Sequence, residues 1–225
     1  MKRLLLLFAL LILPPGLAAG ERPTLMVLGD SLSAAYGFAE EEGWVALLER
    51  RVADHDPPWR VVNASISGDT TRGALTRLPR ALERHDPALV IIELGGNDGL
   101  RGVHPNQMLD EMRTNLTELV RLSLEHGADV LLLGMHLPPN YGSHFTERFH
   151  RIYHDVAREM DVSLVPFFLE GVAEDRALMQ PDGIHPTAEA QARMLENVWE
   201  MLEEMVSCPS SVASCTNNGQ RTTDY

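Results

Sequence analysis

The sequence predicts a three-layer α/β/α sandwich around a five-stranded parallel sheet, in a flavodoxin-like arrangement. Apolar runs of four to six residues alternate along the chain with longer amphipathic segments. Short, nearly all-apolar runs are typical of strands that are covered on both faces. Strand–helix alternation favours parallel strands joined by right-handed crossovers. With 225 residues, the chain is long enough for one such domain with a sizeable core.

The expected elements follow in order along the chain. The apolar runs predict strands at Thr24–Leu28, Arg60–Asn63, Leu89–Leu94, Val130–Gly134 and Ser163–Pro166. The amphipathic segments predict helices at about Gly43–Ala53, Arg72–His85, Pro105–His126, Phe145–Met160 and Thr187–Met205. Thr187 fits the N-cap of the last helix, and Glu189 lies in its first turn.

The two ends of the chain differ from this domain. Residues 1–20 combine a positive start, an apolar run from Leu4 to Leu13 and a small-residue site at Ala18-Ala19-Gly20, which indicates a secretory signal peptide; a retained anchor is the alternative. The domain itself is expected at residues 21–206. Residues 207–225 are rich in Ser, Thr and Asn and are expected to be a disordered tail, where Cys208 and Cys215 could pair. We expect a periplasmic or secreted protein.

The charge of the chain excludes some partners. The formal net charge is −13, and loss of the signal peptide with Lys2 and Arg3 makes it −15. An acidic protein of this kind is not expected to bind nucleic acid or to insert stably into membranes. We expect a monomer whose partner is a small-molecule substrate.

Residues that can carry chemistry follow four of the expected strands. Ser31 follows the first strand, Gly68 the second, Asn97 the third, and the Asp182/His185 turn the fifth. Because the carboxyl ends of parallel strands meet at one edge of a sheet, these residues are expected to converge there. His185, oriented by Asp182, can take a proton from the Ser31 hydroxyl, which is the equipment of acyl transfer.

Each of these residues also has a purely structural explanation. Ser31 in a Gly-Asp-Ser turn is often a helix N-cap, and Asp30 can bond the local backbone. Gly68 and the Gly-rich loop around Asn97 are typical of plain turns. A phosphate-binding loop is not expected, because no Lys-Ser/Thr follows the glycines. Convergence at one sheet edge favours the catalytic interpretation.

No cofactor and no metal are expected. His150 and His154 have the i, i+4 spacing of a zinc site, with His144 nearby, but no helical Glu or cysteine completes it. His136 ends the fourth strand and is expected to line the cleft as a spectator.

Four ordered blocks together resemble the SGNH (GDSL) hydrolase superfamily: Gly29–Ser33, Ser67–Asp69, Gly95–Asp98 and Asp182–Pro186. The resemblance runs from Thr24 to about Trp199, and within the superfamily it is greatest to the bacterial periplasmic thioesterase I/lysophospholipase group. It implies a Ser31/Asp182/His185 triad. It also implies oxyanion donors from the Ser31 N–H, the Gly68 N–H and the Asn97 side chain.

The resemblance predicts a serine esterase acting on acyl esters and thioesters through an acyl-enzyme. We expect the substrate to contact Asp98, Leu100, Leu137, Asn140 and Tyr141, with the apolar members forming an acyl groove. A carbohydrate O-deacetylase of the same fold is the alternative, and it would need aromatics near the cleft, for which Tyr36, Phe38 and Trp44 are the nearest candidates. A lipid-binding protein without turnover is the other alternative, but binding alone needs no catalytic base.

Overall fold

The computed structural model describes residues 22–101 and 104–208. The expected signal peptide and most of the expected tail lie outside these described residues. Cys208, the last described residue of the chain, is disulfide-bonded, and Cys215 lies outside the described part.

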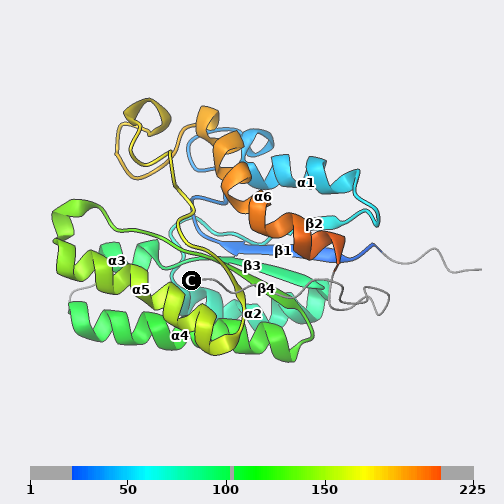
Figure 1. Ribbon diagram of the computed structural model, residues 1–225, viewed down its shortest axis with the longest axis horizontal. Coiled ribbons are helices and arrows are strands. Elements are labelled where there is room, and N and C mark those ends of the chain that lie inside the picture. The colour runs from blue at the N-terminus through cyan, green and yellow to red at the C-terminus, as the bar shows by residue number, and fades with distance from the viewer. Residues whose placement is uncertain (1–21, 102–103, 209–225) are drawn as a thin grey trace, which may run out of the picture.

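A five-stranded parallel sheet forms the centre of the molecule (Figure 1). Its strands are β1 (Thr24–Gly29), β2 (Arg60–Asn63), β3 (Leu89–Glu93), β4 (Asp129–Leu133) and β5 (Ser163–Val165). They lie in the order β2-β1-β3-β4-β5, which confirms the flavodoxin-like prediction. Every residue of β1 and β3 is buried, because these strands have neighbours on both sides and helices on both faces.

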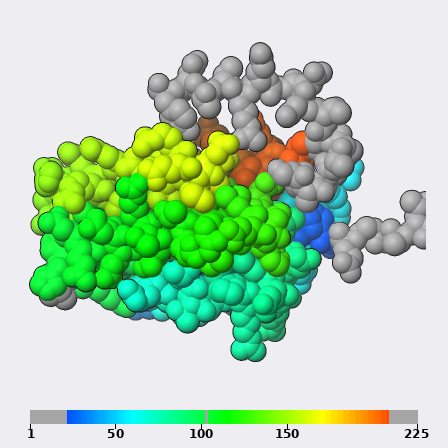
Figure 2. Space-filling view, turned by 90° about the horizontal axis from the view of Figure 1, so that it is seen from below, coloured from blue at the N-terminus to red at the C-terminus, as the bar shows by residue number. Residues whose placement is uncertain are grey.

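Helices cover both faces of the sheet. They are α1 (Trp44–Ala53), α2 (Thr71–His85), α3 (Gly96–Arg101), α4 (Pro105–Glu125), α5 (Ser143–Met160) and α6 (Gln191–Ser207). One face carries α1 and α6, and the other carries α2, α4 and α5 (Figure 1). Figure 2 looks onto the second face, where the side chains of α2, α4 and α5 form one continuous surface. In the described parts of the chain, no helix has both the length and the apolar character needed to cross a bilayer.

The structure corrects the sequence prediction at two places. The Gly-rich segment after β3, expected to be a loop, forms the short helix α3. Glycine weakens an isolated helix, but here Gly99 is buried against Leu137 and Phe149, where an added Cβ would lie 2.6 Å from Leu137 Cδ2. Tertiary packing of a residue without a side chain therefore outweighs its poor helix propensity.

The start of the last helix also differs. Thr187 is the N-cap residue and Glu189 lies in the first turn, as expected, but this turn is a 3₁₀ turn, Ala188–Ala190, that leads into α6, and the Thr187 side chain makes no capping hydrogen bond. The backbone carbonyl of Thr187 instead accepts the Ala190 N–H at 3.2 Å. In this tight first turn, the backbone N–H of Ala190 is therefore satisfied by a main-chain carbonyl instead of by a threonine hydroxyl.

The register of β1 and β3 places the residues of the candidate site next to one another. Gly29, the last residue of β1, pairs with Glu93, the last residue of β3. The loops after these two strands therefore leave the sheet side by side. Strand order also reverses direction at β1, and the crevice outside such a switch point is where open α/β sheets bind ligands.

Candidate active site

Ser31 stands in a chain of turns immediately after β1. The Ala34 N–H donates to the Asp30 carbonyl at 3.0 Å, and the Tyr36 N–H donates to the Ser31 carbonyl at 3.3 Å. The segment does not continue as a regular helix, because Ala35 takes a left-handed conformation with φ 54°. The segment after β1 is thus a series of irregular turns, and the alternative of Ser31 as a helix N-cap does not apply.

His185 joins Ser31 to Asp182, although 154 positions separate the serine from the histidine. The Nε2 atom of His185 lies 2.9 Å from Ser31 Oγ, and its Nδ1 atom lies 2.7 Å from Asp182 Oδ2. With the proton on Nδ1, the ring donates to Asp182 and its Nε2 accepts from the Ser31 hydroxyl. The Tyr36 ring packs on the imidazole with centroids 4.3 Å apart, which limits its rotation.

The turn that carries Asp182 is built around its carboxylate. Oδ1 accepts the backbone N–H groups of Ile184 (2.9 Å) and His185 (3.0 Å), while Oδ2 faces the imidazole. Desolvation raises the pKa of Asp182, but the hydrogen bonds from the His185 side chain and from these two N–H groups outweigh it and lower the pKa to about 2. Asp182 is therefore ionised at neutral pH and holds the histidine in the tautomer that accepts a proton from serine.

The Asn97 side chain is oriented by a buried carboxyl. Its Nδ2 donates to Asp30 Oδ2 at 2.8 Å, which uses one of its two amide hydrogens and leaves the other for a ligand. Asp30 is 2% exposed, and its Oδ1 accepts the Leu32 N–H at 3.0 Å, as expected for a residue that serves its own turn. Burial raises the pKa of Asp30 to about 6, and the hydrogen bonds from Leu32 and Asn97 oppose this rise.

Glu93 supports this turn from below, a role that sequence reasoning missed. It is fully buried, and its Oε2 accepts the Asp30 N–H at 3.2 Å and the Ser33 hydroxyl at 2.8 Å. Its Oε1 has no hydrogen-bond partner among the described residues. Burial, followed by the negative charge of Asp30, raises the pKa of Glu93 well above its usual range. The available signal was an acidic residue ending the otherwise apolar run Leu89–Glu93.

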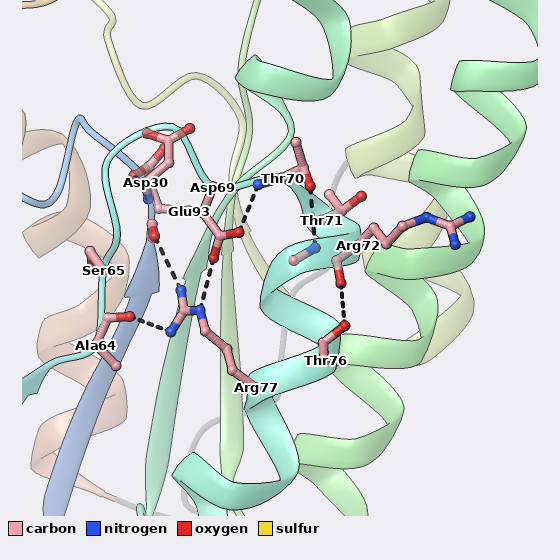
Figure 3. Close-up of polar contacts among 12 residues, drawn as sticks. Asp30, Ala64, Ser65, Asp69, Thr70, Thr71, Arg72, Thr76, Arg77 and Glu93 are labelled. Carbon is pink, nitrogen blue, oxygen red and sulfur yellow. Dashed lines mark hydrogen bonds and ion pairs between the residues drawn. The ribbon is translucent and has the colours of Figure 1, made fainter. Parts of the chain in front are cut away.

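The loop after β2 brings Gly68 to the same edge. Gly68 has φ 79°, a left-handed conformation that favours glycine. Arg77 of α2 fixes this loop, because its guanidinium contacts Asp69 and the Ala64 carbonyl (Figure 3). The same guanidinium also lies 3.5 Å from the Gly29 carbonyl at the end of β1. The Ser31 and Gly68 N–H groups donate to no other group in the described parts of the chain, so both are available to a ligand.

A cavity of about 900 Å³ opens beside Ser31 and His185. Its walls are mainly apolar, and they come from the segments that follow β1, β3, β4 and β5, including the helix α3 and the start of α5. Leu100 and Leu137, two of the expected substrate contacts, line it, as does His136. Other apolar residues among its walls are Met135, Phe167, Leu169, Met179 and Ile184.

Three of the expected substrate contacts lie elsewhere. Asp98 turns away from this cavity because its carboxylate accepts the Thr71 N–H at 2.9 Å and the Thr71 hydroxyl at 2.6 Å. Asn140 and Tyr141 belong to the 3₁₀ turn Pro139–Tyr141, of which only Pro139 lines the cavity, and the Tyr141 ring stacks on Phe145 instead. A sequence motif places such residues near a site, but the turn conformation decides where their side chains point.

The histidines near the cleft form a stack. The rings of His136 and His150 are 3.7 Å apart, and His150 Nε2 lies 3.1 Å from His154 Nε2. Burial, helped by the neighbouring imidazoles, lowers the pKa of His150 to about 4. Over residues 22–101 and 104–208, no group of three or more His, Cys, Asp or Glu side chains is arranged to hold a metal ion.

Comparison with known proteins gives the family. Residues 27–193 match the GDSL-like Lipase/Acylhydrolase family. The chain belongs to this family. An esterase TesA of Pseudomonas aeruginosa is 54% identical over 183 residues, which is 81% of this chain and 89% of that protein. A thioesterase 1/protease 1/lysophospholipase L1 of Escherichia coli K12 is 42% identical over 189 residues, covering 84% of this chain and 88% of that protein.

A solved structure extends the comparison to the fold. The crystal structure of TesA superposes on this GDSL-like acylhydrolase with a TM-score of 0.76 and 54% identity, covering 81% of this chain and 99% of that one. The α/β architecture with five parallel strands is thus shared with a solved family member. This acylhydrolase is a hydrolase of ester bonds.

Proposed function

We propose that this protein is a serine esterase that cleaves acyl esters and thioesters through an acyl-enzyme. Ser31 is the nucleophile, His185 the general base and acid, and Asp182 the residue that orients His185. The continuous contact from Asp182 through His185 to Ser31, at 2.7 and 2.9 Å, carries this proposal.

The reaction follows from the geometry. His185 Nε2 takes the Ser31 proton as Oγ attacks the acyl carbonyl carbon, and Asp182 stabilises the imidazolium. The oxyanion receives hydrogen bonds from the Ser31 N–H, the Gly68 N–H and the second amide hydrogen of Asn97. His185 then protonates the leaving alcohol or thiol, whose bond to the carbonyl carbon breaks. Water repeats the sequence on the acyl-enzyme and releases the acid and free Ser31.

The large cavity supports acyl groups of medium to long chain length. Its volume of about 900 Å³ is far larger than an acetyl group, and its mainly apolar lining suits a hydrocarbon chain. The deacetylase alternative loses one of its three candidate aromatics, because Trp44 is fully buried and its indole N–H donates to Ser33 Oγ at 3.2 Å. A buried tryptophan presents no face for a sugar to stack on.

Export defines the substrates that the enzyme meets. We propose that residues 1–20 direct the chain out of the cytoplasm and are then removed. An exported enzyme has no access to cytosolic acyl-CoA, so lysophospholipids and related esters are its natural substrates. Thioesters are substrates that it cleaves in vitro. N-terminal sequencing of the periplasmic protein should begin at Glu21. Recovery of the intact N-terminus in the cytoplasmic fraction would contradict export.

A chromogenic series tests the enzymatic proposal. p-Nitrophenyl esters from acetyl to palmitoyl should be cleaved with an optimum at medium or long chains, and Ser31→Ala should lose about 10⁶-fold in kcat. A fluorophosphonate should label the wild type and the matched variant Ser33→Ala but not Ser31→Ala, because Ser33 is buried beneath the turn. Activity that survives in Ser31→Ala would refute the proposal, and a preference for acetyl would favour the deacetylase.

A further inference from the structure

Two separate segments of the chain form the contact between Ser31 and His185, and the one that carries the histidine is exposed. His185 lies in a hairpin of residues 178–187, here called the histidine hairpin, in which Met179 and Pro186 form an isolated antiparallel bridge. The tip of this hairpin, residues 181–184, is open to solvent. A single hydrogen bond, such as the one between His185 Nε2 and Ser31 Oγ, contributes little to holding such a hairpin in place.

Gln180 supplies a second connection between the two segments. Its Nε2 carries two hydrogens and donates to the Tyr36 carbonyl at 2.8 Å and to the Pro186 carbonyl at 2.9 Å. Tyr36 belongs to the nucleophile segment, residues 30–38, whereas Pro186 follows His185 in the histidine hairpin. Over residues 22–101 and 104–208, the bond from Gln180 to Tyr36 is the only hydrogen bond, besides the catalytic one, that joins the nucleophile segment to this hairpin.

These contacts close a circuit of hydrogen bonds around the catalytic pair. The Tyr36 N–H donates to the Ser31 carbonyl at 3.3 Å, and the Gln180 N–H donates to the His185 carbonyl at 2.7 Å. With the bond from Gln180 Nε2 to the Tyr36 carbonyl, three hydrogen bonds therefore join the main chain of the serine to that of the histidine. The same residue also holds the main chain of Tyr36, whose ring packs on the imidazole with centroids 4.3 Å apart.

The surroundings of Gln180 point to a role in holding the hairpin and not in binding substrate. Gly37 has φ 90°, and a Cβ at this position would lie 2.6 Å from Gln180 Oε1, so the amide packs directly against the main chain of the nucleophile segment. Gln180 is not among the residues that line the acyl cavity. Its hydrogen bonds go to main-chain atoms and to no catalytic side chain.

We infer that Gln180 is a positioning residue of the proposed reaction: its amide fastens the histidine hairpin to the nucleophile segment and so keeps His185 Nε2 within hydrogen-bond reach of Ser31 Oγ. This inference rests on the proposed function and adds a residue outside the triad and the oxyanion donors. Gln180 acts through His185, because a base that is misplaced by about 1 Å can cost about 10²-fold in rate.

Two substitutions remove the amide donors and test the inference. Gln180→Met keeps the length of the side chain, and Gln180→Glu keeps its shape, but a carboxylate cannot donate to the two carbonyls. Both should lower kcat on p-nitrophenyl octanoate by about 10–10²-fold, with KM within about twofold of the wild type. A fluorophosphonate should label Ser31 more slowly by a similar factor. Circular dichroism spectra and urea midpoints establish that the variants are folded.

Asn197→Leu is the matched control. Asn197 Nδ2 also donates to two main-chain carbonyls, those of Phe168 at 3.0 Å and Glu170 at 2.9 Å, but neither lies in the histidine hairpin. This variant should lower the urea midpoint and leave kcat within about twofold of the wild type. A second comparison uses a His185→Ala background, where Gln180→Met should change the residual rate by less than about twofold, because no imidazole remains to be positioned.

Each outcome decides a different point. An unchanged kcat in the two Gln180 variants overturns the inference, and so does a rise in KM alone, which would assign Gln180 to substrate binding. An equal loss of kcat in Asn197→Leu, or a further loss in the His185→Ala background, shows a general structural effect and also overturns it. If the wild type cleaves the octanoyl ester no faster than Ser31→Ala does, the proposed function fails, independently of Gln180.

Discussion

Replacement of Asp30 by asparagine tests the buried carboxyl beside the nucleophile. Burial raises the pKa of Asp30 to about 6 from an ordinary value of 3.8. Below pH 3.8 the proton is bound in both the folded and unfolded states. Between pH 4 and 6 the folded protein keeps a proton that the unfolded chain has lost, so the free energy of unfolding falls as pH rises through this window. The difference between the two pKa values corresponds to about 3 kcal/mol.

Asparagine does not titrate, so the free energy of unfolding of the variant does not fall with pH for this reason. The free energy of unfolding of Asp30→Asn, relative to the wild type, should rise by about 2 kcal/mol between pH 4 and pH 7, which is most of the change expected over the whole titration. Urea denaturation of both proteins at several pH values across the window measures this difference in the free energy of unfolding. The contributions of groups that titrate alike in both proteins cancel in the difference. The same comparison in a Glu93→Gln background removes the neighbouring carboxyl from the titration, and the rise should persist there.

The same substitution should also impair catalysis. The new amide would face the Asn97 amide, so two donors would meet where Asp30 Oδ2 now accepts the Asn97 Nδ2–H at 2.8 Å. Asn97 should turn away, with a loss of up to about 10²–10³ in kcat on an octanoyl ester. A difference in unfolding free energy that stays constant from pH 4 to 7 would refute the titration argument. An unchanged kcat would refute the positioning argument.

Three other substitutions probe the site and its scaffold. Asn97→Ala should lower kcat by about 10²–10³ while KM changes little, since an oxyanion donor acts mainly in the transition state, and an unchanged kcat would exclude that role. Asp182→Asn should lower kcat by about 10⁴, because its oxygen can keep the two backbone hydrogen bonds while its amide favours the wrong tautomer of His185; the circular dichroism spectrum should match the wild type. Gly134→Ala should lower the free energy of unfolding by about 1–3 kcal/mol, because its Cβ would lie 2.1 Å from the Pro166 carbonyl oxygen, and a wild-type urea midpoint would contradict this packing.

Much of the frame could be predicted from local patterns. The apolar runs gave the five strands to within a residue or two, because strands buried on both faces must be apolar along their whole length. The order of the motifs, each after a different strand, placed Ser31 and His185 at one sheet edge, where the structure has them 2.9 Å apart. Parallel strands share a carboxyl edge whatever their order, so this convergence follows from the sequence alone.

The tertiary structure decided what lies beneath and around that edge. Only the pairing of Gly29 with Glu93 brings a buried carboxyl group under the Asp30 turn, and only the packing of Gly99 on Leu137 makes a helix from a glycine-rich segment. The Arg101 guanidinium packs against Gly68 because the helix α3, which ends at Arg101, brings this side chain to the loop after β2. A sequence pattern records which residues are buried, but not which buried residues become neighbours, and the hydrogen bonds of this site depend on those neighbours.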